Sequence, residues 1–572
     1  MPRNPKLRLR WFSGLPPETG RGKKDGGPSA AEEMPAMLPQ ADTYDDLYKN
    51  FRWDIPARFN IATACCDRYA DGSGRLALIY VDEDGGTQKL SFDEISALSK
   101  SFANVLKADG LKRGDRVAVF LSQSVELPIA HLAAFRSGMI SVPLFTLFGE
   151  DALEYRLSNS GARAVITDEG GWDKLSKIRD RLPHLQDIYV TSGAVHAGAK
   201  SFWQSIEDAS EDFQTVDTSP DDPAIIIYTS GTTGNPKGAL HAHRVLLGHL
   251  PNVEMAHDFF PKPGDLMWTP ADWAWIGGLF DALFPAWYHG VPMLGYRAKK
   301  FEPQAAMQLM ADHGVRNVFL PPTALKLMRQ ADVKHSGVKL RSIFSGGESL
   351  GAELIEWVRA TFGVDVHEIY GQTECNLVLA NNSHLFPIKP GSMGKPTPGF
   401  DVRIVNEHGE ELPRNERGIV GVRVPNPVTM IEYWKNPEAT AKKYAGGFLL
   451  TGDLGVQDDD GYFWYVSRED DVITSAGYRI GPAEIEHTLM KHPAVAMSAV
   501  VGIPDPIRTE AIKAWIVLRP GFTASDALAK DIQDFVKVQL AAHEYPRHIQ
   551  FADALPMTAT GKVLRRELRT LG

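Results

Sequence analysis

Short apolar runs alternate along the chain with longer stretches whose apolar residues recur at helical spacing. The strands predicted by apolar and β-branched runs lie at 116–121, 140–144, 164–167, 224–228, 317–320, 340–344 and 364–369. A helix is predicted at 125–136, between the first two strands. Strands that alternate with helices are typical of βαβ units and mainly parallel sheets. We therefore expect an α/β fold, with a large N-terminal domain whose βαβ-type sheets are flanked by helices.

The pattern changes near residue 468. Beyond it the sequence predicts a helix at 482–491, strands at 497–501 and 511–518, and a helix that begins after Ser525, a residue type that caps helix N-termini. A chain of 572 residues is also too long for one ordinary core. We therefore predict two domains, a large one at 43–467 and a small α+β domain at 468–572.

The first 42 residues differ from the rest of the chain. They begin with basic residues and continue rich in Gly, Pro, Lys and Glu, without apolar periodicity. No apolar segment follows the basic start, which argues against a secretory signal. We predict a disordered extension at 1–42. An organellar presequence, or a start codon assigned upstream of Met34 or Met37, is the alternative.

Composition narrows the class of protein. Apolar residues make up 43% of the chain and charged residues 23%, and the formal net charge is −10, which argues against a binder of nucleic acid or acidic membranes. No apolar run is long enough to span a bilayer, so no integral membrane association is expected. The three cysteines suggest neither a disulfide framework nor a zinc site. A reducing, cytoplasmic location fits best, and the mitochondrial matrix is the alternative if the basic N-terminus is a presequence.

The segment 228–238, YTSGTTGNPKG, carries the clearest chemical signal. It follows an apolar strand and combines glycines, hydroxyl side chains and one lysine, Lys237. Such a loop can surround phosphate oxygens with N–H and hydroxyl groups while the lysine adds a point charge. Its spacing differs from a Walker A loop, because Pro236 stands where that pattern requires glycine. The candidate phosphate-binding residues are Thr229, Ser230, Gly231, Thr232, Thr233, Gly234 and Lys237.

This segment resembles the phosphate loop of the adenylate-forming (ANL) superfamily. Further signatures of that superfamily follow in order: GGESLG at 346–351, YGQTE at 370–374, TGD at 451–453, REDDVITSAGYRIGP at 468–482 and PMTATGK at 556–562. Segments 50–62 and 478–486 are most similar to the short- and medium-chain acyl-CoA synthetases. The resemblance implies an AMP-forming acid–thiol ligase that uses ATP, Mg²⁺ and coenzyme A, and makes acyl-CoA, AMP and diphosphate through an acyl-adenylate.

Several residues suit the first half-reaction. Glu374 is a carboxylate suited to Mg²⁺ that bridges ATP phosphates, and Asp453 can accept both hydroxyls of a ribose. Lys562 can stabilise the negative charge that builds up when a carboxylate attacks the α-phosphate. Other residues are assigned to ATP or AMP by the resemblance, namely Gly347, Glu348, Ser349, Glu368, Ile369, Tyr370, Gly371, Gln372, Thr373, Arg468 and Arg479.

The second half-reaction brings in a thiol. The resemblance implies that the small domain rotates about Asp470 between the two steps, which exchanges the loop of Lys562 for the loop at 477–479. Gly477 would let pantetheine pass close to the backbone. The residues that resemble coenzyme A contacts are Ala476, Gly477, Tyr478, Arg508, Lys537 and Tyr545.

The acyl pocket is expected around a helix that opens in segment 272–280, with Trp275, Ile276 and Gly277 on its wall; its tryptophans could equally be core residues. Acetyl-CoA synthetases resemble this sequence but carry tryptophan at the position of Gly371. Loss of an indole there should make room for several methylenes, each worth about 0.8 kcal/mol when buried. We therefore predict an acid larger than acetate: short branched, medium-chain or aryl.

Other functions remain open from the residues. They are a stand-alone adenylation enzyme that loads a carrier protein, an acetyl-CoA synthetase, a catalytically inactive nucleotide-binding protein and a luciferase-like oxidase. A homodimer is compatible with the residues. Acetylation of Lys562 by an acetyltransferase, reversed by a deacetylase, is a further hypothesis, because it would remove the charge of that lysine.

Overall fold

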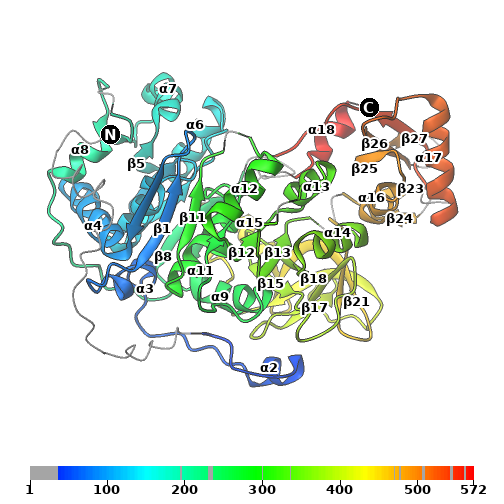
Figure 1. The fold of residues 1–572 in the computed structure, drawn as a ribbon, viewed down its shortest axis with the longest axis horizontal. Coiled ribbons are helices and arrows are strands. Elements are labelled where there is room, and N and C mark those ends of the chain that lie inside the picture. The colour runs from blue at the N-terminus through cyan, green and yellow to red at the C-terminus, as the bar shows by residue number, and fades with distance from the viewer. Residues whose placement is uncertain are drawn as a thin grey trace.

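The computed structural model describes residues 36–571, apart from 194–195, 230–235, 299, 335, 349, 469–470, 476–477, 506–508, 541–544 and 559–561. The described residues form three β-sheets with helices packed around them. Two sheets belong to the large domain, and the third forms the small domain at the right of Figure 1. The predicted α/β class and the division into a large and a small domain are confirmed.

The first large-domain sheet has eight strands. In spatial order they are β19 (Glu432–Tyr433), β9 (Gly238–Ala242), β8 (Pro223–Tyr228), β4 (Ile140–Pro143), β3 (Arg116–Phe120), β5 (Ala162–Thr167), β6 (Asp187–Val190) and β7 (Lys200–Ser201). Strands β8, β4, β3, β5, β6 and β7 run parallel. Strand β3, RVAVF, is almost entirely apolar because a parallel strand inside an α/β sheet is covered on both faces.

The second large-domain sheet has fourteen strands. In spatial order they are β17 (Val402–Val405), β18 (Arg417–Arg423), β21 (Phe448–Gln457), β22 (Phe463–Arg468), β16 (Ser392–Pro396), β15 (Asn376–Ala380), β14 (Val366–Gln372), β13 (Ser342–Gly346), β12 (Asn317–Phe319), β10 (Met267–Trp268), β11 (Met293–Tyr296), β1 (Leu76–Val81) and β2 (Thr87–Ser91), with β20 (Tyr444–Ala445) beside β21. Strands β14, β13, β12, β10, β11 and β1 are parallel, as predicted. Strands β15 to β22 pair antiparallel, which the expectation of mainly parallel sheets did not include.

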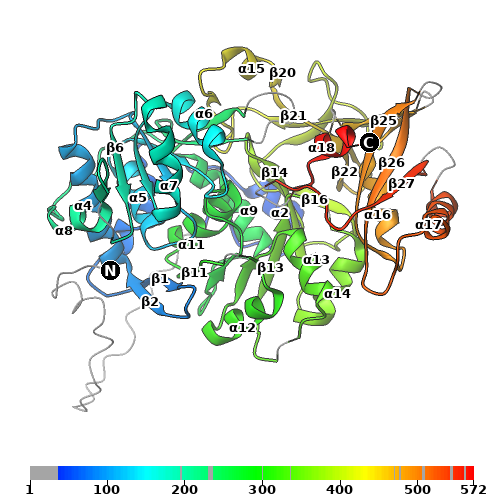
Figure 2. The same ribbon diagram turned by 90° about the horizontal axis from the view of Figure 1, so that it is seen from above.

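Helices cover these sheets (Figures 1 and 2). They are α2 (Tyr44–Asn50), α3 (Ile61–Cys65), α4 (Phe92–Ala108), α5 (Glu126–Arg136), α6 (Glu150–Ser160), α7 (Glu169–Ile178), α8 (Phe202–Glu207), α9 (Val245–Ala256), α10 (Ile276–Gly278), α11 (Phe284–Tyr288), α12 (Pro303–His313), α13 (Pro322–Gln330), α14 (Ala352–Phe362) and α15 (Pro437–Ala441), with short 3₁₀ turns at Asp67–Tyr69 and Arg179–Arg181. The helix expected in segment 272–280 begins only at Ile276 and continues into a π-helical turn, η3 (Leu279–Leu283). None of the helices in the described ranges combines the length and apolarity that crossing a bilayer requires.

The small domain is a five-stranded sheet with helices on it. Its elements are β23 (Ile473–Ser475), β24 (Tyr478–Ile480), α16 (Pro482–Met490), β25 (Val495–Asp505), β26 (Thr509–Leu518), α17 (Asp526–Gln539), β27 (His548–Phe551) and α18 (Arg565–Thr570). Ser525 caps α17 as predicted, because its hydroxyl accepts the N–H of Leu528 at 3.2 Å. Strand β22 of the large-domain sheet extends to Arg468, so the small domain begins just after the predicted boundary.

The predicted N-terminal boundary needs a larger correction. Residues 36–42 were expected to belong to a disordered extension, but Leu38 is only 5% exposed. The backbone N–H groups of Met37 and Leu38 donate to the buried carboxylate of Glu254 in α9. The large domain therefore begins at least six residues before the predicted start, because these polar contacts leave no trace in hydrophobic periodicity.

Candidate active site

The predicted nucleotide residues follow the carboxyl ends of neighbouring parallel strands. Gly347 and Glu348 come directly after β13, and Tyr370 to Gln372 end β14 beside it. Trp275 lies a few residues after β10 of the same sheet. Ligands of open α/β sheets bind at this edge, because the loops there converge on one crevice.

Asp453 is the centre of a buried polar cluster. Its carboxylate accepts hydrogen bonds from the Tyr370 hydroxyl at 2.7 Å and from Gln372 Nε2 at 3.0 Å. Arg468 lies opposite Asp453 in the β21–β22 pair, with its Nε 3.4 Å from Asp453 Oδ1. Burial and the nearby Asp453 carboxylate raise the pKa of Tyr370 well above its ordinary value, so this phenol stays a donor. The structure thus joins three separate predicted motifs around one carboxylate.

The predicted phosphate loop closes a hairpin between β8 and β9. Tyr228 and Gly238 are paired across the two strands, and the Thr229 N–H donates to the Lys237 carbonyl at 2.9 Å. The loop therefore begins and ends at the same point of the sheet edge. Its middle, with Ser230, Gly231, Thr232, Thr233 and Gly234, lies outside the described residues.

Glu374 occupies the turn between β14 and β15 and is nevertheless only 9% exposed. The segment that ends in β19 covers it: the Met430 N–H donates to the Glu374 carbonyl at 2.8 Å, and the Tyr433 hydroxyl donates to Glu374 Oε1. Lys237 Nζ lies 5.1 Å from the centre of the Tyr433 ring. The sequence analysis missed Tyr433, because its partner lies 59 residues away and no motif joins the two.

Two other predicted acids have structural partners. Glu348 accepts a salt bridge from Lys326 Nζ at 3.0 Å, and buried Glu368 accepts the Leu350 N–H at 3.2 Å. Ile369 is buried and paired with Gly346 across β13 and β14. These residues shape the loop after β13, and Thr373 lies in the turn that leads to Glu374.

Lys562 of the small domain reaches the large-domain site. A Cβ built on Gly347 would lie 3.8 Å from Lys562 Cε and 3.7 Å from the Trp275 ring. Gly347 has φ of +98°, a conformation that side-chain-bearing residues rarely adopt. Both domains therefore contribute residues to one place.

Gly371 is constrained by its neighbours. A Cβ on this residue would lie 1.5 Å from the Asn376 carbonyl oxygen of β15, at an irregularity in the β14–β15 pairing. The close approach of two backbones explains why only glycine fits. Gly371 was predicted to enlarge the acyl pocket, but a side chain at this position would point at the backbone of Asn376.

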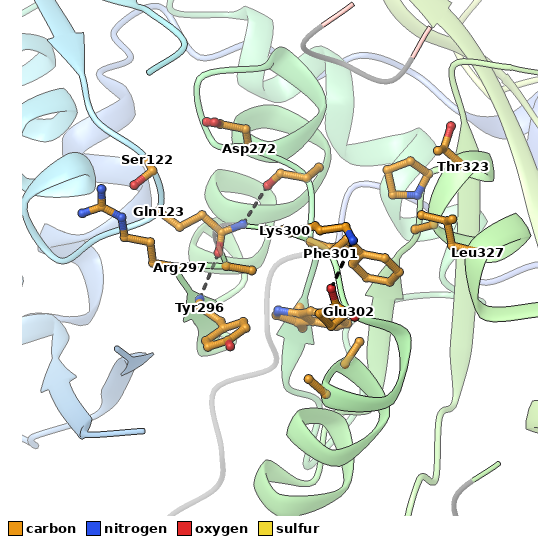
Figure 3. A pocket seen from close by; sticks show the side chains of 18 of the residues that line it. Ser122, Gln123, Asp272, Tyr296, Arg297, Lys300, Phe301, Glu302, Thr323 and Leu327 are labelled. Atoms are coloured by element: carbon orange, nitrogen blue, oxygen red, sulfur yellow. Dashed lines mark hydrogen bonds and ion pairs between the residues drawn. The ribbon is translucent and has the colours of Figure 1, made fainter. Parts of the chain in front are cut away.

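A cavity of about 650 Å³ opens beside Trp275 (Figure 3). It lies at the carboxyl ends of strands from both large-domain sheets, with Phe145, Pro321, Ala324 and Leu327 among its apolar lining. Ile276 and Gly277, also predicted for the acyl pocket, are buried next to Trp275 and do not line this cavity.

Gln123 connects the two sheets at this cavity. Its Nε2 donates to the Thr269 and Ala271 carbonyls at 3.0 and 2.7 Å, and its Oε1 accepts the Tyr296 N–H at 3.0 Å. Gln123 follows β3 of one sheet, whereas its partners lie at the ends of β10 and β11 of the other (Figure 3). This residue, which the sequence analysis did not single out, fixes the spacing of the cavity walls.

Asp272 is the acid on the cavity wall next to Trp275. Its Oδ1 accepts the Ala274 N–H at 2.8 Å. Burial raises the pKa of Asp272 to about 6, and the Ala274 hydrogen bond offsets only part of that shift.

The predicted coenzyme A contacts are only partly described. Lys537 Nζ lies 5.4 Å from the centre of the Tyr545 ring, and the Arg547 guanidinium lies 4.5 Å from it on the same aromatic residue. Arg547 is a basic residue that the sequence analysis missed. Tyr478 and Arg479 lie in β24, opposite Ser475 and Thr474. In addition to residues 230–234 of the phosphate loop, the predicted residues that lie outside the described residues are Ser349, Asp470, Ala476, Gly477 and Arg508.

These features define a nucleotide-binding α/β enzyme whose site is completed by its small C-terminal domain. A profile of the AMP-binding enzyme family matches residues 67–434, and one of the AMP-binding enzyme C-terminal domain matches residues 484–562. The chain belongs to the AMP-binding enzyme family, and the resemblance seen in its motifs is confirmed.

Named relatives extend over nearly the whole chain. Acyl-coenzyme A synthetase ACSM3, mitochondrial, of Mus musculus is 36% identical over 540 residues, which cover 92% of this chain and 93% of that protein. Acetyl-coenzyme A synthetase of Bacillus subtilis is 36% identical over 547 residues, covering 92% and 94%. The crystal structure of the anthranilate CoA ligase AuaEII in complex with anthranoyl-AMP superposes with a TM-score of 0.84 at 28% identity, covering 91% of this chain and 98% of that one.

Proposed function

We propose that this enzyme joins a carboxylic acid to coenzyme A with cleavage of ATP to AMP and diphosphate. In the first half-reaction a carboxylate oxygen attacks the α-phosphorus of ATP and diphosphate leaves. In the second, the coenzyme A sulfur loses its proton and attacks the acyl carbon, and AMP leaves. The relatives named as coenzyme A synthetases and the acyl-AMP complex of the AuaEII ligase support this assignment.

The contact between Lys562 and Gly347 is the observation that carries the first half-reaction. It puts the lysine ammonium arm at the loop after β13, on the same sheet edge as Tyr370 and Asp453. A cation at this place lowers the energy of the transition state, because both the attacking carboxylate and the phosphate are negatively charged. In this proposal Asp453 and Arg468 hold the ribose, and Lys237 approaches the β- and γ-phosphates.

The residues around Glu374 fit Mg²⁺. Within the described ranges no group of three or more His, Cys, Asp or Glu side chains could form a protein cage for a metal. Mg²⁺ is commonly held by one or two carboxylates together with substrate phosphates and water, so a single buried carboxylate near a phosphate loop suits it. Tyr433 holds Glu374 Oε1, which leaves the other oxygen for the ion. Bound there, Mg²⁺ would neutralise phosphate charge.

The cavity beside Trp275 is a candidate site for the acyl chain or for the thiol arm of coenzyme A. Its wall is mainly apolar, and its volume exceeds what acetate needs by a wide margin. We propose that the acid is larger than acetate: short branched, medium-chain or aryl.

The small domain offers a candidate site for the phosphorylated nucleotide of coenzyme A. Two cations, Lys537 and Arg547, lie there beside the aromatic face of Tyr545.

The deciding experiment measures ATP-dependent diphosphate release, with and without coenzyme A, over acetate, butyrate, isobutyrate, hexanoate, octanoate and benzoate. Mass spectrometry quantifies AMP and acyl-CoA. We expect turnover that depends on coenzyme A and favours acids larger than acetate. Preference for acetate would identify an acetyl-CoA synthetase, and adenylate without consumption of coenzyme A would identify an enzyme that loads a carrier protein. Absence of diphosphate with every acid would refute the proposal.

The substitution Ala324→Met decides what occupies the cavity, because Ala324 lines it and is almost fully buried. If the acyl chain occupies the cavity, the variant shifts preference toward shorter acids in the diphosphate assay. If the thiol arm occupies it, the KM for coenzyme A rises while diphosphate release in its absence is unchanged. Ala527→Met, at an exposed position of α17, is the matched control.

A further inference from the structure

Tyr433 connects two residues that the proposed first half-reaction uses. Its hydroxyl donates to Glu374 Oε1, and the ammonium of Lys237 lies 5.1 Å from the centre of its ring. Tyr433 is 2% exposed and Glu374 9% exposed, so the hydrogen bond between them is shielded from bulk water. The same side chain therefore contacts a candidate phosphate ligand with its face and a candidate metal ligand with its edge.

The backbone holds this tyrosine rigidly in place. Tyr433 pairs with Ala239 of β9, the strand that follows the phosphate loop, and its N–H donates to Thr440 Oγ1 at 2.9 Å. Three residues earlier, Met430 donates its N–H to the Glu374 carbonyl. The segment 430–433 is thus attached to the phosphate-loop strand on one side and to the Glu374 turn on the other.

The ring also keeps the two charges apart. Lys237 and Glu374 both contact Tyr433, and none of the salt bridges among the described residues joins the two directly. A direct ion pair would give each charge a partner that ATP and Mg²⁺ would have to displace, at a cost that rises with burial. A phenol that donates to the carboxylate and faces the cation satisfies both groups more weakly. Both residues therefore stay available to ligands.

We infer that Tyr433 is a positioning residue for adenylation, which directs one oxygen of Glu374 to the metal ion and holds Lys237 beside the phosphate loop. This inference rests on the proposed function, in which Glu374 and Lys237 contact Mg²⁺–ATP. Residues that orient a metal ligand commonly change metal affinity 10- to 100-fold when they are replaced. Because Tyr433 acts through Glu374, its loss should weaken binding of the metal–nucleotide complex more than binding of the carboxylic acid.

The first test compares Tyr433→Phe with the wild type, with Glu374→Gln and with Tyr462→Phe. Tyr462 is a buried tyrosine whose hydroxyl donates to the Pro387 carbonyl at 2.6 Å, so its variant loses a comparable hydrogen bond elsewhere. Binding of Mn²⁺ with a non-hydrolysable ATP analogue is measured by electron paramagnetic resonance, and the Mg²⁺ dependence of diphosphate release is measured in parallel. We expect Tyr433→Phe to raise the Kd for Mn²⁺ roughly tenfold, with Tyr462→Phe at the wild-type value.

A second series covers the outcome in which Tyr433→Phe does not fold. Fluorinated tyrosines at position 433 keep the shape of the ring but make it a poorer partner for a cation and the hydroxyl a stronger donor. Burial and the adjacent Glu374 carboxylate raise the pKa of Tyr433 far above its ordinary value, which favours the protonated, donating form of the phenol. Fluorination keeps the hydrogen bond to Glu374 and weakens the contact of the ring with Lys237, so we expect the Kd for the ATP analogue to rise with each added fluorine. We expect 4-aminophenylalanine, which retains an N–H donor to Glu374, to keep the Kd for Mn²⁺ near the wild-type value.

Equal Mn²⁺ affinity in the wild type and Tyr433→Phe, or equal affinity for the ATP analogue across the fluorinated series, would overturn the inference. Failure of the proposed function looks different, because then the wild type and Glu374→Gln would bind Mn²⁺ and the ATP analogue equally and neither would release diphosphate with any acid.

Discussion

Lys562 of the small domain lies against Gly347 of the large domain, with its Cε 3.8 Å from the position that a Gly347 Cβ would occupy. Gly347 has a positive φ of +98°, and the Trp275 ring lies 3.7 Å from the same Cβ position, so a side chain at residue 347 would be strained and would touch both neighbours. This contact joins the last motif of the sequence to the loop after β13, in the middle of the chain.

Replacement of Lys562 should separate the two half-reactions. We expect Lys562→Ala to lower the rate of acid-dependent diphosphate release about 10²- to 10³-fold, because a charge aimed at the transition state is lost. Formation of acyl-CoA from a chemically prepared acyl-adenylate should stay near the wild-type rate. Lys530→Ala, an exposed lysine of α17 that pairs with Asp534, is the control. Equal losses in both assays would show that Lys562 supports the fold or the second step instead.

Acetylation of Lys562 should have the same selectivity, because it removes the charge and keeps the arm. The enzyme would be prepared with acetyl-lysine at position 562, and intact mass would establish full modification. We expect diphosphate release to fall to the level of Lys562→Ala and to recover after treatment with a deacetylase. Wild-type adenylation by fully acetylated enzyme would contradict this form of regulation.

The loops of the site were predictable where one continuous motif carries the chemistry. The hairpin of Thr229 and Lys237 and the turn of Glu374 follow from the local sequence, because glycine-rich and hydroxyl-rich segments after buried strands form such loops. Tyr433 and Gln123 were not predictable in this way. Their partners are distant in sequence, and only the folded structure shows that they converge.

The fold was predicted best where strands are buried on both faces. The apolar run of β3 was placed within one residue, because a continuous apolar segment identifies a parallel strand. The antiparallel strands β16 to β22 were missed, because these strands mix polar and apolar residues and contain glycines such as Gly394 and Gly455 that interrupt periodicity.

Gly371→Ala should affect stability more than acid preference. The new methyl group would overlap the Asn376 carbonyl, so β14 and β15 would have to separate at a cost of about 1–3 kcal/mol. Urea denaturation measures this loss, and Gly170→Ala, within α7 where a Cβ meets only an ordinary contact at 3.7 Å, is the control. A stable Gly371→Ala enzyme that merely prefers shorter acids would restore the interpretation in terms of pocket volume.

Asp272→Asn should change the pH dependence of stability. Because burial raises the pKa of Asp272 to about 6, the folded protein binds a proton that the unfolded chain releases near pH 4. The protonated Asp272 carboxyl therefore makes its full contribution to the free energy of unfolding below pH 4, and this contribution is lost as the pH rises through 6. Asparagine keeps an oxygen for the Ala274 N–H and cannot ionise. The free energy of unfolding would be measured by urea denaturation at each pH. We expect its value for the variant to rise relative to the wild type between pH 4 and 7, by up to about 3 kcal/mol. A difference that is independent of pH would contradict this.

The buried carboxylate of Glu254 makes the N-terminal segment part of the fold. It accepts the Met37 N–H at 2.8 and 3.0 Å and the Leu38 N–H at 2.8 Å, and His289 Nε2 lies 3.2 Å away. If residues 36–39 are removed, the carboxylate loses its backbone donors and keeps only the His289 contact, and the loss of a partner by a buried charge typically costs about 3–5 kcal/mol. We therefore expect a variant that lacks residues 1–39 to unfold at a clearly lower urea concentration than one that lacks residues 1–35, which keeps every contact described. If the segment contributes only through this carboxylate, Glu254→Leu should make the two truncated forms equally stable. A difference between them that persists in the Glu254→Leu background would assign the effect to the packing of Leu38, which is buried next to the same helix.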